Sequence, residues 1–69
     1  MTADEFRARA SSVLLGRGWQ VRLSRALGKN YDTVRNWSSG RVPVPPEVVA
    51  VIEFLETVPH PLRPARWVE

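Results

Sequence analysis

The sequence predicts an all-α fold, a small four-helix domain with a central helix-turn-helix and an extended C-terminal tail. In four stretches apolar residues recur three or four positions apart, the spacing of one face of an amphipathic helix. Glycine follows three of these stretches, as is common at helix ends. The 69 residues include no cysteine, so one small core has to form without disulfides. We expect a domain over residues 1–58 and a proline-rich tail over residues 59–69.

The first predicted helix covers residues 2–15. Thr2 is a suitable N-cap, and Glu5 stands three positions later, as in a capping box. Its apolar stripe is formed by Phe6, Ala10, Val13 and Leu14. The glycines at 16 and 18 should end this helix in a flexible turn.

Two short helices, over residues 19–27 and 31–39, form the centre of the prediction. Gly28 ends the first, because glycine readily takes the left-handed conformation of a helix end. Asn30 can accept a hydrogen bond from a free backbone N–H and so cap the second. The apolar stripes are formed by Leu23 and Leu27 in the first helix and by Val34 and Trp37 in the second. Two helices joined by such a short glycine turn are a helix-turn-helix.

The last predicted helix covers residues 46–57 and opens with Pro46, a residue favoured in a first helical turn. Its inner stripe is formed by Val48, Val51, Ile52 and Leu55. Further apolar residues lie beside this stripe and in the tail, and exposed apolar patches usually mark an interface. We therefore expect a homodimer contact formed by Val49, Phe54, Val58, Leu62 and Trp67.

The prolines of the tail preclude a regular helix there. The tail then folds back on the domain, packs on a partner chain, or stays an exposed terminus. His60 lies between two prolines, and we expect no catalytic role for it.

Positive charge is concentrated in residues 7–41. This window holds eight basic residues and one acidic residue, a net charge of +7, whereas the rest of the chain carries −4. A basic block centred on a helix-turn-helix is typical of a phosphate-binding surface. The alternative for the charge alone is an ordinary solvated surface.

The central stretch resembles the Cro/lambda-repressor-like, or XRE-type, helix-turn-helix DNA-binding proteins. The resemblance covers residues 5–57, and its marks are Gln20, Leu23, Ala26, Leu27, Gly28, Thr33, Val34, Trp37 and Gly40. Two residues depart from the family pattern: the family usually has alanine where Ser24 stands and a small apolar residue where Lys29 stands. The family's last helix also has no counterpart in this chain.

The resemblance implies that helix 31–39 enters the major groove, with Tyr31, Asp32 and Asn36 at the main base-contacting positions and Thr33 and Arg35 beside them. The chemistry agrees in part, because arginine can pair with guanine and asparagine with adenine. Asp32 either accepts from cytosine or only stabilises the helix dipole. The expected DNA phosphate contacts are Gln20, Arg22, Arg25, Lys29, Asn30, Ser39 and Arg41, of which Gln20 follows from the resemblance.

These observations favour a sequence-specific transcription regulator, a bacterial or phage repressor that binds an inverted-repeat operator in double-stranded DNA as a homodimer. The alternative is a protein–protein interaction module, antitoxin-like or polymerase-contacting, on the same scaffold. We expect no enzyme, cofactor or metal site, because the sequence has no nucleophile–base pairing and a single histidine. No apolar run is long enough to span a membrane, so we expect a cytoplasmic protein.

Overall fold

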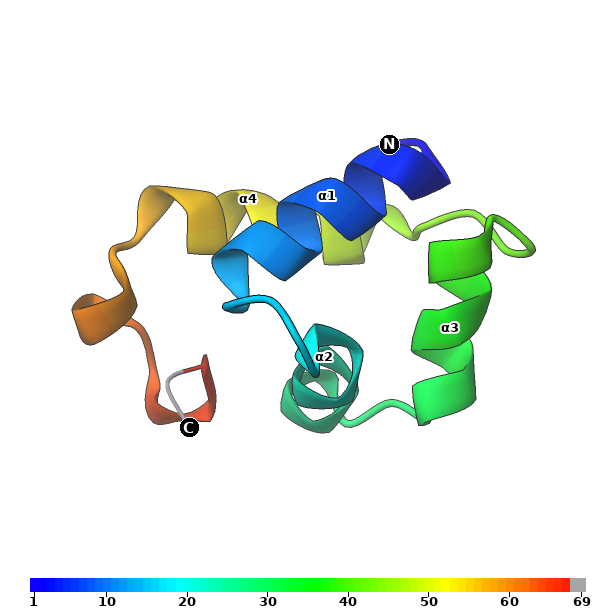
Figure 1. Ribbon diagram of the computed structural model, residues 1–69. Helices are drawn as coiled ribbons and strands as arrows, with labels where there is room; N and C mark the ends of the chain where they lie inside the picture. Colours follow the sequence, from blue (N-terminus) through cyan, green and yellow to red (C-terminus); the bar gives the residue numbers. More distant parts are fainter. Residues whose placement is uncertain (68–69) are drawn as a thin grey trace.

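The computed structural model describes residues 1–67 and is a small all-α domain of four helices (Figure 1). The helices are α1 (Ala3–Val13), α2 (Trp19–Leu27), α3 (Tyr31–Ser39) and α4 (Pro46–Thr57), followed by the 3₁₀ turns η1 (His60–Leu62) and η2 (Ala65–Trp67). The bounds of α2, α3 and α4 match the prediction, whereas α1 is shorter than residues 2–15. It ends early because Leu15 takes a left-handed conformation, at φ 66°, before the first glycine.

The helix ends use the caps that the sequence predicts. The Glu5 N–H donates to Thr2 Oγ1 over 3.1 Å, and the Thr2 N–H donates to Glu5 Oε1 over 3.2 Å, which completes the capping box. The hydrogen bond from the Thr2 backbone holds the pKa of Glu5 below its ordinary value. Asn30 Oδ1 accepts from the Asp32 N–H over 2.9 Å at the start of α3, and Gly28 ends α2 at φ 67°.

The core draws side chains from all four helices. Its largest fully buried members are Phe6 of α1, Leu23 of α2, Val34 of α3, and Ile52 and Leu55 of α4. Around the Phe6 ring, Trp19 and Trp37 pack edge-on at centroid distances of 5.4 and 6.2 Å. Such pairs add about 0.5–1.5 kcal/mol beyond area burial. Phe6 therefore fixes where α2 and α3 lie against α1.

The tail folds back onto the domain instead of extending away from it (Figure 1). The Arg63 guanidinium donates to three backbone carbonyls, those of Val13 (2.7 Å), Leu55 (2.6 Å) and Val58 (3.0 Å). Trp67, one of the expected dimer contacts, packs against the chain's own core and is half-buried. The last two residues of the predicted tail lie outside the described residues.

The C-terminal end of α1 is capped from α2. Arg22 Nε donates to the Leu14 carbonyl over 3.0 Å, and Arg22 Nη2 donates to the Leu14 carbonyl and, over 2.9 Å, to that of Arg17. The last turn of α1 has no basic residue of its own to satisfy its free carbonyls. The Arg22 side chain therefore serves as a helix cap, a role that the sequence analysis did not assign to it, and its predicted phosphate contact stays a prediction.

Candidate nucleic-acid interface

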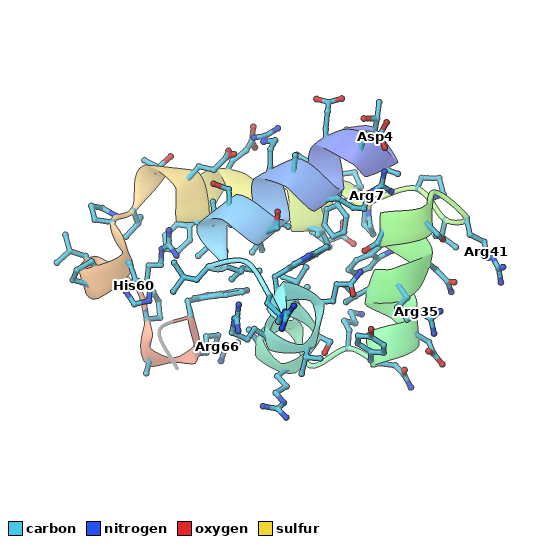
Figure 2. All side chains as sticks on the ribbon, in the orientation of Figure 1. Asp4, Arg7, Arg35, Arg41, His60 and Arg66 are labelled. Carbon is cyan, nitrogen blue, oxygen red and sulfur yellow. The ribbon has the colours of Figure 1, made fainter. Side chains whose placement is uncertain are left out.

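The exposed face of α3 brings together five of the predicted DNA-contact residues. They line one open hollow of about 360 Å³, formed by Asp32, Arg35, Asn36, Ser39 and Arg41. At 3.6 residues per turn, the first four project from the side of α3 opposite the buried Val34, as the sequence spacing requires. Arg41 points away from the body of the molecule in Figure 2, and Arg35 is exposed on α3. The hollow thus combines three predicted base contacts with two predicted phosphate contacts.

Arg35 is held only loosely on this face. Its Nη1 lies 4.0 Å from Asp32 Oδ1, and both side chains are largely exposed, at 64% and 78%. The guanidinium also lies 5.9 Å from the centroid of the Tyr31 ring. An exposed ion pair at this separation contributes little. Both charged groups can therefore exchange this contact for hydrogen bonds to another molecule, while Asp32 also lies in the first turn, where it stabilises the α3 dipole.

Gln20 joins α2 to α3. Its Nε2 donates to Ser38 Oγ over 3.0 Å, and Ser38 Oγ donates to the Val34 carbonyl over 2.9 Å. On the same side, the Tyr31 hydroxyl donates to Gln20 Oε1 over 3.4 Å. Gln20 and Tyr31 thus lie at the junction of the two helices. The sequence reasoning missed Ser38, although its place four residues after Val34 puts it on the buried side of α3.

The other predicted contacts lie elsewhere. Thr33 and Lys29 line a separate groove of about 200 Å³ between α3 and α4, together with Leu27, Trp37, Pro45, Glu47, Val48 and Val51. Asn30 is exposed at the N-terminal end of α3, where it serves as the cap. Arg25 lies beside the folded tail, in a hollow that it shares with Arg66.

Two arginines of the basic block, Arg7 and Arg9, are occupied by partners within the chain. Arg7 donates to the Ser38 carbonyl and to Asp4 Oδ1, and so links α1 to the end of α3 (Figure 2). Arg9 Nε donates to Glu56 Oε2 over 2.8 Å, which lowers the pKa of Glu56 and raises that of Arg9. Together with Arg22, they belong to the scaffold. The contacts Arg7–Ser38 and Arg9–Glu56 join positions 31 and 47 apart, so no local pattern in the sequence predicts them.

The predicted dimer residues differ in how much of each side chain is exposed. Val49 and Phe54 are five positions apart on α4, which places them about 140° apart around the helix. Phe54 and Leu62 are the most exposed of the set, at 43% and 74%. Val49 and Val58 are half-buried. Of the predicted dimer residues, Phe54 and Leu62 therefore leave the most apolar surface for a partner.

Comparisons with protein-family models, with curated proteins and with solved structures found no match to this chain. Within residues 1–67, no three His, Cys, Asp or Glu side chains gather in a way that could hold a metal ion. None of the helices in this part of the chain has the length and apolarity needed to cross a membrane.

Proposed function

We propose that this chain is a sequence-specific DNA-binding transcription regulator that places α3 in the major groove of double-stranded DNA. The observation that carries the proposal is the exposed hollow on α3, lined by Asp32, Arg35, Asn36, Ser39 and Arg41. The major groove admits an α-helix, and these side-chain types match the hydrogen-bonding groups of base edges and phosphates.

The roles of the side chains follow from their chemistry. Arg35 pairs with guanine O6 and N7, and Asn36 pairs with adenine N6 and N7. Asp32 accepts from cytosine N4, and Arg41, just beyond the end of α3, binds a backbone phosphate. The Gln20–Ser38 hydrogen bond holds α3 at a fixed angle to α2 before DNA arrives. Such preorganisation lowers the ordering cost of binding.

We further propose that a homodimer binds an inverted-repeat operator and represses transcription by blocking polymerase, in the cytoplasm of a bacterium or of a phage-infected cell. The exposed apolar side chains of Phe54 and Leu62 support a partner surface away from α3. Two copies of α3 would then lie about 34 Å apart, one turn of DNA. Sedimentation equilibrium tests the dimer, which Phe54→Ser combined with Leu62→Ser should dissociate.

The second candidate is an interaction module that binds a protein partner. The groove between α3 and α4 favours it, because Leu27, Trp37 and Val51 give this groove an apolar wall. It differs from the first candidate in needing no contact between α3 and DNA.

The deciding experiment is a gel shift on the DNA upstream of the protein's own gene, in competition with random DNA at near-physiological salt. A preference of about a thousandfold or more supports a sequence-specific regulator, and footprinting then gives the half-site spacing. Equal, weak binding to both DNAs moves the assignment to the interaction module.

Two α3 variants refine this experiment. Arg35→Ala and Asn36→Ala should each cost about 1–3 kcal/mol at the specific site and relax the base preference at one position. Arg17→Ala is the matched control, since it also removes an exposed arginine, but from the loop between α1 and α2. A loss that is uniform on all sequences contradicts the assignment of Arg35 and Asn36 as base readers.

Arg41→Ala should weaken binding to every sequence. One lost phosphate contact should reduce the slope of log K against log salt by about 0.9. An unchanged slope removes Arg41 from the phosphate contacts.

A further inference from the structure

A second basic hollow lies on the side of α2 away from α3. It encloses about 380 Å³ and is lined by Arg25, Ala26, Leu27 and Gly28 of the end of α2 and by Arg66 of the tail. Figure 2 shows Arg66 to the left of α2, with α3 on the right. Two guanidinium groups therefore border one open space, and no carboxylate belongs to its lining within residues 1–67.

The folded tail holds Arg66 in this position. Arg63 fastens the tail to three backbone carbonyls, and Trp67 packs on the core, so the residue between these two anchors has little freedom to leave. Arg66 Nη1 donates to the Ala26 carbonyl over 3.1 Å. That single bond leaves the other N–H groups of the planar guanidinium for a second acceptor.

Arg25 lines the same hollow as Arg66 and is exposed. The ion pairs within residues 1–67 involve Arg7, Arg9 and Arg35, and neither arginine of the hollow takes part in them. Two like charges that border one space repel each other, and an anion placed between them removes that repulsion. A guanidinium group can bind two phosphate oxygens at once, whereas the ammonium group of a lysine acts as a point charge. Two arginines are therefore well suited to bind a phosphate here.

We propose that Arg25 and Arg66 form a phosphate-binding site, separate from the α3 hollow and completed by the folded tail. The phosphate belongs either to the DNA backbone beside the half-site or to a small phosphorylated ligand. Binding of a DNA phosphate depends on the proposed function, whereas binding of a small phosphorylated ligand does not.

The first arm of the test uses inorganic phosphate on the full-length, isotope-labelled chain, exchanged against chloride at constant ionic strength. We expect saturable NMR shifts of the Nε–H signals of Arg25 and Arg66. Arg25→Gln and Arg66→Gln should each weaken the apparent affinity at least fivefold. Arg17→Gln, which removes the same charge from the exposed loop between α1 and α2 and does not line the hollow, should leave it unchanged.

The second arm measures the salt dependence of DNA binding by the same variants. If the phosphate comes from the DNA backbone, Arg25→Gln should reduce the slope of log K against log salt by about 0.9, and Arg17→Gln should not. If the slope stays unchanged, or the protein binds no DNA, while phosphate still binds through the two arginines, the site takes a small phosphorylated ligand. In the case of no DNA binding, the proposed function fails and this site stands.

The proposal is overturned if inorganic phosphate gives no saturable, arginine-dependent shift and the salt slope of Arg25→Gln equals that of the wild type. Arg66→Gln also loses the bond to the Ala26 carbonyl, so thermal melting must accompany it. Arg25→Gln breaks no hydrogen bond of the described residues and therefore decides the outcome if the other variant melts early.

Discussion

The C-terminal ends of α1 and α4 and the exposed face of α3 both carry arginines, but the two regions use them in opposite ways. At the helix ends, Arg22 and Arg63 donate to backbone carbonyls of α1, α4 and their following turns. On α3, Arg35 has only two loose contacts, the exposed Asp32 carboxylate at 4.0 Å and the Tyr31 ring at 5.9 Å. The guanidinium groups bind several backbone carbonyls in the first region and are open to solvent in the second.

The reason lies in the helix ends themselves. Neither α1 nor α4 has a basic residue in its last turn, and the last carbonyls of a helix lack partners within it. The missing donors arrive from α2 and from the tail. Net charge along the sequence therefore overstates the phosphate-binding surface, because part of the charge is consumed inside the fold.

The largest effect that this comparison predicts is on stability. Arg63→Ala leaves three carbonyls without their donor and should lower the free energy of unfolding by about 2–3 kcal/mol. Arg35→Ala, on the open face, should stay within about 0.5 kcal/mol of the wild type. Urea denaturation measures both, and equal losses would abolish the distinction between the two regions.

A smaller effect on stability is expected at the end of α3, where a buried serine and an exposed serine are neighbours. Ser38→Ala removes a buried hydroxyl that accepts from Gln20, and it should cost about 1 kcal/mol of stability. The neighbouring Ser39→Ala, on the exposed face, is the control and should change stability by less than about 0.5 kcal/mol. If both serines behaved alike, Ser38 would not hold Gln20 in place.

Leu15 lies beside the carbonyls that Arg22 caps and allows a stabilising substitution. It is the one non-glycine residue at positive φ within the described chain, and it is 68% exposed. Leu15→Gly should raise the free energy of unfolding by up to about 1 kcal/mol, because glycine carries no left-handed penalty. Leu62→Gly, an exposed leucine without positive φ, should give no gain. A destabilised Leu15→Gly would mean that the Leu15 side chain packs against something.

The smallest effect is expected at the exposed Arg9–Glu56 pair. The hydrogen bonds from Arg9 hold the pKa of Glu56 in the folded protein below its pKa in the unfolded chain. The pair therefore stabilises the fold fully at pH values above the pKa of Glu56 in the unfolded chain. This stabilisation is lost as the pH falls through the pKa of Glu56 in the folded protein. The melting temperature of Glu56→Gln should therefore lie slightly below that of the wild type at neutral pH and equal it in acid. Glu53→Gln on the same helix is the control, and a Glu56 difference that persisted in acid would contradict the pairing.

Much of the fold follows from local signals in the sequence. The capping box at Thr2, the left-handed glycine at 28 and the proline at 46 set helix bounds through contacts between near neighbours, so these bounds were predictable. The α3 face was predictable for a similar reason, because helical periodicity alone separates Asp32 and Asn36 from the buried stripe.

The remainder depends on residues that are distant in the sequence. The cap formed by Arg22 and the bridge from Gln20 to Ser38 require α2 to be docked against its neighbours. The prediction from the prolines that the tail forms no regular helix is confirmed. The 3₁₀ turns that form there were not predicted, because such a turn needs only one hydrogen bond and tolerates proline in its first turn. Periodicity also could not show that Thr33 faces the groove beside α4.

The bond from Arg63 to the Val13 carbonyl has a consequence for the order of folding. It joins positions 50 residues apart, so a long loop must close before it can form. We therefore expect the Val13 carbonyl to acquire its donor late, after α4 has docked and the tail has turned back, whereas the neighbouring Leu14 carbonyl accepts from Arg22, only eight positions away. In hydrogen exchange, we expect the amides at this end of α1 to be less protected than those around the buried Phe6.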